Sequence, residues 1–286
     1  MQEISIKNEK QTRKHLQKIT VFPFQTTFLK VKKSYLCTKQ FIMLSLFKSK
    51  PKLSELIPSG YVDIHSHVLP GIDDGAQTST DSEVLLEAMH NLGFDTVITT
   101  PHTIKNVWDN NVATITNAYH QVANELPNWK QKLNLRFASE YLLDENLIQL
   151  AQQTALLPLK DKTILIELSY LNPPIPLYEY LFELQLKGYQ LVLAHPERYN
   201  YFHNHKKEFE KLKKAGCKFQ LNLLATVGYY GKEVAQTADY LLKNQMCDFA
   251  GSDIHHKKHV AAFQNKVVIK NFRTLEEVMS KNAFFK

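Results

Sequence analysis

After residue 60 the chain alternates short apolar runs with longer amphipathic stretches, and this alternation limits the fold more than any other feature. The apolar runs, which we predict to be strands, cover residues 61–65, 95–100, 133–139, 163–168, 191–195, 219–224 and 247–252. Amphipathic stretches typical of helices lie between them at residues 80–93, 175–188, 205–216 and 232–244. Continuous apolar strands joined by helices are typical of a parallel sheet that is buried on both faces. Seven such units favour an α/β fold closed into a barrel, with an open sheet as the alternative.

Ionisable side chains follow almost every apolar run, at the point where the predicted strand ends. They are His65, His67, Asp73 and Asp74 after the first run, His102 after the second, Glu140 after the third, Glu167 within the fourth, His195 after the fifth, and Asp253 and His255 after the seventh. Taken singly, each has an ordinary explanation: His102 as a loop histidine, His195 as a core histidine, Asp253 as a helix N-cap. In a parallel barrel, however, all these strand ends meet on one face.

This concentration of ionisable groups predicts bound metal. Burying so many charges costs several kcal/mol each unless a cation compensates them. Histidine and carboxylate ligands without cysteine select Mn²⁺, Fe²⁺ or Zn²⁺, and the set is larger than one ion needs, so we expect two or three ions. Clustered ions are suited to phosphoester hydrolysis, because they activate a water and neutralise charge on the leaving oxygen.

A single arginine near the cluster is suited to binding phosphate. Arg198 follows His195 by three residues, so it can reach over the same face. A guanidinium donates two parallel hydrogen bonds to phosphate oxygens, which makes Arg198 a candidate phosphate clamp. The alternative is a surface ion pair with the neighbouring Glu197.

The sequence lacks the motifs of several other enzyme classes. None of Cys37, Cys217 and Cys247 is followed by arginine at the spacing of a cysteine phosphatase. There is no phosphate-binding Gly-x4-Gly-Lys loop, no Gly-x-Ser-x-Gly elbow and no Cys-x2-Cys pair. Three scattered cysteines imply no disulfide framework and fit a reducing cytoplasm.

Basic charge is concentrated in the first part of the chain. The net charge is +7, but residues 1–60 contain 12 Lys and Arg against 3 Asp and Glu, so the remainder is slightly acidic. This distribution disfavours a nucleic-acid enzyme, which carries its positive charge on the folded domain.

We expect residues 1–42 to be a disordered leader or a start-site artefact with Met43 as the natural start, residues 43–60 to be a basic linker, and residues 61–286 to be the catalytic domain. The apolar stretch at residues 41–47 is too short to span a bilayer, and no small-residue cleavage site follows it. Contact with a membrane surface through basic and Phe side chains is the alternative for the leader.

The segments "DIHSHVLPGIDDGAQT", "TTPH", "ASE", "LIELS", "LAHPERY" and "GSDIHH", in this order, resemble the PHP (polymerase and histidinol phosphatase) superfamily. Within it they are most similar to the bacterial tyrosine-protein phosphatases of capsule and exopolysaccharide operons, over about residues 50–282. The resemblance implies a distorted (β/α)7 TIM-like barrel with a trinuclear site, usually supplied with Mn²⁺.

The resemblance also implies a ligand set. The first ion would be held by His65, His67, Glu140 and Asp253, and the second, bridged by Glu140, by Glu167 and His195; the third would be held by Asp74, His102 and His255. Asp73 is the alternative to Asp74, and Arg198 would clamp the phosphate. Relatives often have a second arginine after the Asp-x-His motif, whereas this chain has Lys257, Lys258 and His259. Lys258 is the expected substitute, although a lysine lacks the bidentate fork.

We therefore expect a cytoplasmic metal-dependent phosphatase acting on phosphotyrosine in a protein, such as the tyrosine-rich tail of a polysaccharide-export kinase. One alternative is a histidinol-phosphate or sugar-phosphate phosphatase of the same superfamily, which an assay on both substrate types distinguishes. Another is a non-catalytic metal-binding scaffold, against which the complete ligand set argues.

Overall fold

In the computed structural model, which describes residues 49–286, every strand runs parallel to the strands that it pairs with. The strands are β1 (Tyr61–Asp63), β2 (Phe94–Thr99), β3 (His102–Thr103), β4 (Leu135–Phe137), β5 (Glu140–Leu142), β6 (Thr163–Glu167), β7 (Gln190–Ala194), β8 (Lys218–Asn222) and β9 (Phe249–Gly251). They form a three-stranded sheet in the order β1-β2-β4 and a six-stranded sheet in the order β3-β5-β6-β7-β8-β9. The leader predicted at residues 1–42 lies outside the described residues.

The predicted α/β class with parallel strands is confirmed, but within residues 49–286 the strands form two sheets and no single closed barrel. The run predicted as one strand at residues 133–139 is two short strands, β4 and β5, with Glu140 as the first residue of the second. Pro101, which has no N–H to donate, separates β2 from β3 in the same way. Backbone hydrogen bonds from Ala138 to Thr99 and from Glu140 to Pro101 cross these breaks.

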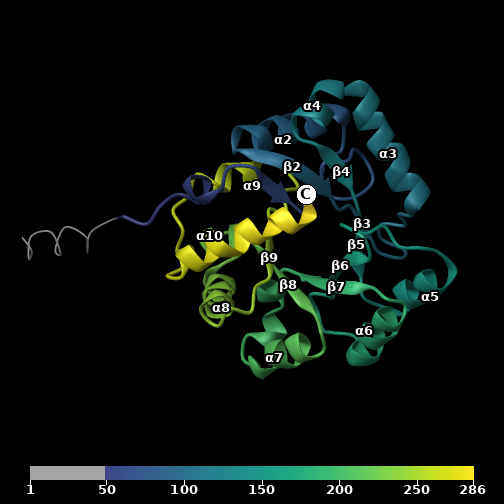
Figure 1. The fold of residues 1–286 in the computed structure, drawn as a ribbon, viewed down its shortest axis with the longest axis vertical. Coiled ribbons are helices and arrows are strands. Elements are labelled where there is room, and N and C mark those ends of the chain that lie inside the picture. Colours follow the sequence, from purple (N-terminus) through teal and green to yellow (C-terminus); the bar gives the residue numbers. More distant parts are fainter. Residues whose placement is uncertain (1–48) are drawn as a thin grey trace, which may run out of the picture. The chain divides into compact units, whose positions relative to one another are not determined.

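Helices surround the strands (Figure 1). They are α2 (Ser79–Asn91), α3 (Val112–Glu125), α4 (Pro127–Lys132), α5 (Glu145–Gln153), α6 (Leu177–Leu186), α7 (Lys207–Lys214), α8 (Lys232–Lys243), α9 (Lys257–Ala262) and α10 (Phe272–Lys281), with 3₁₀ turns η1 (Leu53–Leu56), η2 (Pro196–Arg198), η3 (Asn200–Phe202), η4 (Leu223–Val227) and η5 (Asn282–Phe285). Four of the helices were predicted, with ends differing by at most two residues. None of the helices in residues 49–286 has both the length and the apolar character that a membrane span requires.

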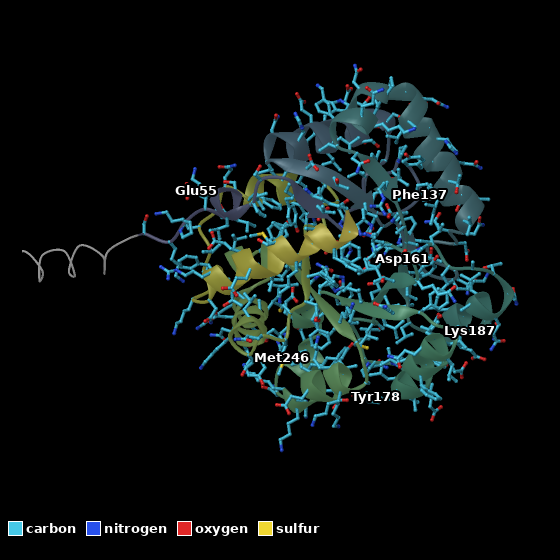
Figure 2. The ribbon with its side chains drawn as sticks, viewed as in Figure 1. Glu55, Phe137, Asp161, Tyr178, Lys187 and Met246 are labelled. Atoms are coloured by element: carbon cyan, nitrogen blue, oxygen red, sulfur yellow. The ribbon has the colours of Figure 1, made fainter. Side chains whose placement is uncertain are left out.

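The longer strands β6, β7 and β8 are buried on both faces, as continuous apolar runs predict, and side chains fill the space between strands and helices (Figure 2). On β6, Ile164 and Ile166 belong to the large core that includes helix residues. Leu165, between them, packs instead in a second cluster with Val192 of β7 and Phe285 of η5. Alternate residues of one strand thus enter different cores, because successive side chains point to opposite faces.

The turn η5 joins the first strand to the last. The Asn282 amide donates to the carbonyl oxygens of Val62 in β1 (2.8 Å) and Ala250 in β9 (2.6 Å), and its oxygen accepts from the Ala250 N–H (3.1 Å). Nearby, the Ser252 N–H and hydroxyl both donate to the buried Asp63 carboxylate at 2.8 Å. Side chains rather than a continuous ladder therefore hold β1 beside β9.

Replacing Asn282 by Ala is expected to destabilise the fold by about 2–4 kcal/mol, since buried backbone groups left unpaired cost about 1–3 kcal/mol each. For a domain of this size that lowers Tm by roughly 4–16 °C, measured by thermal unfolding in the same metal-loaded state. Ser280→Ala is the matched control, because this exposed hydroxyl bonds only its own helix at the Glu276 oxygen. Equal Tm values for the two variants would contradict the role of Asn282.

Candidate metal centre

Most polar residues predicted from strand ends lie at or just beyond the carboxyl end of a strand: His65 follows β1, Glu167 ends β6, His195 follows β7 and Asp253 lies two residues beyond β9. His102 and Glu140 instead begin the short strands β3 and β5, which follow β2 and β4 after a break. His195 and Asp253 have positive φ angles of 36° and 51°. Few non-glycine residues adopt this left-handed region, and such strain is typical of functional sites.

The Glu140 carboxylate lies at the centre of the cluster and is completely buried. Its Oε2 is 3.1 Å from His65 Nε2, 3.5 Å from His67 Nε2 and 3.2 Å from His102 Nδ1, and its Oε1 is 3.1 Å from His195 Nε2. One carboxylate thus faces four imidazoles: His65 and His67 follow β1, His102 begins β3, and His195 follows β7.

Two further carboxylates extend the cluster on either side of Glu140. Asp253 Oδ1 lies 3.3 Å from His65 Nε2, 3.5 Å from His67 Nε2 and 3.4 Å from His255 Nδ1. Glu167 Oε1 lies 2.9 Å from His102 Nδ1.

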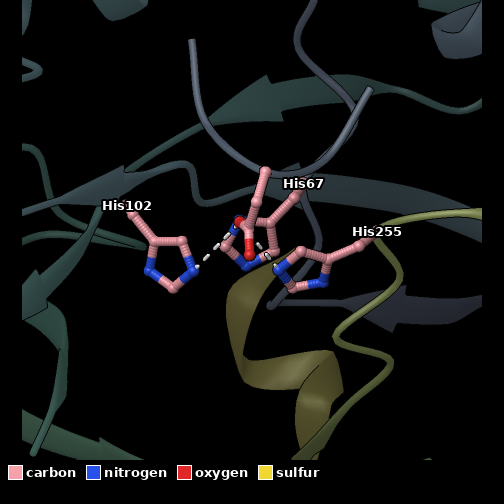
Figure 3. Close-up of side chains that lie close together, drawn as sticks. His67, His102 and His255 are labelled. Carbon is pink, nitrogen blue, oxygen red and sulfur yellow. Dashed lines mark ion pairs between the residues drawn. The ribbon is translucent and has the colours of Figure 1, made fainter. Parts of the chain in front are cut away.

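Asp74 completes a second group with His102 and His255. Its Oδ1 lies 3.5 Å from His102 Nε2 and 3.4 Å from His255 Nε2, and Figure 3 shows these two pairs beside the ring of His67. Asp73, the alternative at this position, points elsewhere: its Oδ2 is 2.8 Å from His67 Nδ1, and its Oδ1 accepts from the Gly75 N–H. The geometry therefore favours Asp74 as the residue facing the cluster.

Two side chains orient the histidines from outside the cluster. Asp73 accepts from His67 Nδ1, and Gln220 Oε1 lies 2.8 Å from His65 Nδ1 while its amide nitrogen donates to the Leu221 oxygen. Both histidines therefore present Nε2 to the cluster, which is how outer partners fix metal-binding imidazoles. The sequence analysis missed Gln220, although a polar residue in the apolar run 219–224 was a usable signal.

A glycine makes room for this arrangement. A Cβ at Gly251 would lie 2.7 Å from both the His65 Cβ and the Gln220 amide nitrogen. Contacts this short are not tolerated, so β9 approaches His65 closely only because residue 251 has no side chain.

The buried carboxylates strongly favour positive charge within the cluster. Burial alone lowers the pKa of His65, but Glu140 and Asp253 raise it to about 9. Burial likewise raises the pKa of Glu140, and His65 and His102 more than reverse this, so the pKa lies well below its usual value. In the protein alone, protonated imidazoles supply this positive charge. A metal cation would supply it while the imidazoles stay neutral.

The donor atoms fit bound cations. Several buried atoms in the cluster have no hydrogen-bond partner, although oppositely charged atoms lie nearby; among them are His67 Nε2, His102 Nδ1, Glu140 Oε1 and Glu167 Oε1. Atoms that bind one ion at about 2.0–2.2 Å lie roughly 3–4 Å from one another, which matches the contacts above. Four groups of potential ligand atoms lie within 4.8 Å of one another: His67, Asp74, His102 and His255; His65, His67 and Asp253; His65, Glu140 and His195; and His102, Glu140 and Glu167.

Arg198 lies beside this cluster, in a cavity of about 200 Å³ that Asp74, His102, His195, Asp253 and His255 also line. Its Nη1 donates to Asp253 Oδ2 at 2.7 Å. The alternative of a surface pair with Glu197 is wrong: Glu197 is buried, accepts from the Asn222 N–H, and its pKa is raised by burial to about 8. Lys258 is exposed on α9 and lines a neighbouring groove instead of this cavity.

Known proteins resemble this chain over most of the described region. It is 32% identical to the tyrosine-protein phosphatase YwqE of Bacillus subtilis over 198 residues, which cover 69% of this chain and 78% of the relative. It is 24% identical to the tyrosine-protein phosphatase CpsB of Streptococcus pneumoniae, over 68% of this chain and 83% of the relative. A solved structure described as one of the "crystal structures of YwqE from Bacillus subtilis and CpsB from Streptococcus pneumoniae, unique metal-dependent tyrosine phosphatases" superposes with a TM-score of 0.66 at 30% identity, covering 76% of this chain and 86% of that one.

These matches confirm the predicted resemblance to the capsule branch of tyrosine phosphatases. The family described as "capsular polysaccharide synthesis, CpsB/CapC" matches residues 61–282, which contain every residue of the cluster. The chain therefore belongs to the CpsB/CapC family of capsular polysaccharide synthesis proteins.

Proposed function

We propose that this chain is a metal-dependent protein-tyrosine phosphatase of capsular or exopolysaccharide synthesis. The observation that carries the proposal is the buried histidine–carboxylate cluster with Arg198 in the same cavity. The relatives named above are tyrosine-protein phosphatases, and the solved structure is described as metal-dependent, which supports the same activity here.

We propose three metal ions in this site. His65, His67, Glu140 and Asp253 would hold the first, Glu140 with Glu167 and His195 the second, and Asp74, His102 and His255 the third. The group of His65, His67 and Asp253 supports the first ion, and the group that contains Asp74, His102 and His255 supports the third. Glu140 belongs to both remaining groups, with His195 in one and Glu167 in the other, which supports its role as a bridge. The nitrogen and oxygen donors support Mn²⁺, with Fe²⁺ and Zn²⁺ as alternatives.

The side chains divide the work of phosphate hydrolysis. Bound cations of this type polarise a phosphoryl oxygen and lower the pKa of a bound water. Arg198 would bind two phosphate oxygens through its fork, and Asp253 Oδ2, which accepts from Nη1, orients the guanidinium. Gln220 and Asp73 keep His65 and His67 in the orientation that the cations require.

The size of the cavity supports a protein substrate. About 200 Å³ is less than the roughly 300–1,000 Å³ of pockets that enclose a small ligand, so the phosphate and its side chain enter while the rest of the substrate stays outside. We propose that the protein acts in the cytoplasm and that this substrate is the tyrosine-rich tail of a polysaccharide-export kinase. We also propose that the two sheets are parts of a distorted (β/α)7 barrel, supported by the backbone bonds from His67 to Ile254 and from Asp253 to His65.

A cysteine nucleophile is disfavoured among the described residues. Cys217 and Cys247 are both buried, and burial raises the pKa of Cys217 to about 12. A thiolate, which such a nucleophile must be, is therefore strongly disfavoured at Cys217.

Removal of metal is expected to abolish hydrolysis of a phosphotyrosine peptide and to lower Tm, because the buried carboxylates lose their compensating charge. Adding Mn²⁺ should restore both, while alkylation of the cysteines should leave turnover intact. Full activity in protein shown to be metal-free by elemental analysis would contradict the mechanism. Faster turnover of histidinol phosphate than of the peptide would favour the small-molecule alternative.

Glu140→Gln and Arg198→Ala are expected to lose activity for different reasons. Glu140→Gln removes the charge that four imidazoles face, so metal content and activity should both fall, whereas Glu145→Gln, at the exposed first residue of α5, should change neither. Arg198→Ala should keep its metal, since Asp253 retains the Asn222 amide at 2.8 Å, and should lose about 10²–10³-fold in kcat/KM.

Arg198→Lys should recover only part of this loss, and Arg273→Ala, at an exposed arginine of α10, should be silent. Elemental analysis measures the metal content of the Glu140 and Arg198 variants, and steady-state kinetics on the same preparations measures their kcat/KM. Wild-type kinetics in Arg198→Ala would exclude the phosphate clamp.

A chain that starts at Met43 is expected to keep the Tm and kcat of the full chain, because residues 50–286 form a compact unit by themselves. A chain that starts at Ser59 should be less stable, since it lacks the buried Leu53 and Leu56 of η1. A large drop for the Met43 chain would show that residues 1–42 contribute to the domain.

A further inference from the structure

One aromatic residue of the cavity has no part in the ligand set or the phosphate clamp. Tyr170 lies in the loop between β6 and α6, three residues after Glu167, and lines the same cavity as Arg198 and Asp253. Its side chain is not packed away, because 46% of the residue is exposed. A large, partly apolar side chain in this position is available to a ligand.

Tyr170 and Arg198 are fixed against each other. The Arg198 guanidinium carbon lies 4.9 Å from the centre of the Tyr170 ring and 4.3 Å from that of Tyr230. Tyr230 is in turn anchored, since its hydroxyl accepts from the Asn222 amide at 3.2 Å. The ring of His195 stacks on Tyr170 with centroids 5.8 Å apart and an angle of 23°. The exposed ring of Tyr170 therefore has a defined position next to the phosphate-binding group.

An aryl phosphate bound at Arg198 would bring its own ring close to the ring of Tyr170. In phosphotyrosine only one oxygen separates the phosphorus from the ring, so a phosphate held by Arg198 brings the substrate ring to the wall where Tyr170 lies. Aromatic rings with centroids about 4.5–7 Å apart attract each other in offset or edge-to-face geometry. A serine or sugar phosphate has no ring to offer.

We propose that Tyr170 is a specificity-determining residue that selects aryl over alkyl phosphate monoesters by contact with the substrate ring. This inference rests on the proposed phosphatase activity and names the side chain that recognises the tyrosine. Its rival is a positioning role, because the Tyr170 hydroxyl lies 3.4 Å from His195 Nε2. A positioning role affects every phosphate ligand equally, whereas ring recognition affects only aryl ligands.

The test compares two competitive inhibitors of the metal-loaded enzyme, phenylphosphonate and inorganic phosphate, assayed with p-nitrophenyl phosphate. The ratio of their inhibition constants measures what the ring contributes. We expect Tyr170→Leu to reduce the preference for phenylphosphonate by about three- to tenfold, the size of an aromatic contact. Tyr170→Phe, which keeps the ring, should stay within about twofold of the wild type.

Tyr178→Leu is the matched control, since Tyr178 is a partly exposed tyrosine of α6 at the periphery in Figure 2 and does not line the cavity. An unchanged ratio in Tyr170→Leu would overturn the proposal. If both inhibition constants rise by the same factor, the ratio is unchanged and Tyr170 positions His195 instead. The proposed function fails by a different result: a wild type that cleaves alkyl phosphates and leaves a phosphotyrosine peptide intact.

Discussion

The attraction between one buried carboxylate and the imidazoles around it is the interaction on which the rest of the site depends. Glu140 faces His65, His67, His102 and His195 at 3.1–3.5 Å, and these histidines come from three separate places along the chain. A buried carboxylate surrounded by neutral rings is unfavourable, so the cluster needs cations or protons. Catalysis and stability are therefore linked, because the same positive charge that would activate water also satisfies the interior of the protein.

Part of the energetic cost of this arrangement is strain in the backbone. Residues 195 and 253 adopt the left-handed conformation although neither is glycine, and β9 passes His65 so closely that residue 251 has no room for a side chain. Such strain persists only where the surrounding structure fixes it. Here the parallel strands and both cores fix the strand ends, which explains why a rigid scaffold carries a site made almost entirely of loop and strand-end residues.

The α/β class and the residues of the cluster were predictable, because both follow from local patterns: apolar runs such as 163–168 and polar residues such as His195 at their ends. Local patterns did not predict the break between β4 and β5. They also did not predict that Asp73 orients His67 instead of facing the cluster, or that Gln220 orients His65. Each depends on which segments meet in three dimensions, and a single sequence does not state that. The expected clamp at Lys258 rested on sequence order alone, whereas α9 leaves this residue exposed beside a different groove.

The contact of Asn282 with β1 has a consequence for how the protein is made. The strand that supplies His65 and His67 is synthesised early, but the amide that ties it to β9 follows it by more than two hundred residues. Contacts between such distant residues form late and slow the folding of a domain. A nascent chain therefore exposes His65, His67 and His102 well before His195, Asp253 and His255 leave the ribosome. Loading of the proposed metal site would follow translation and depend on the C-terminal turn.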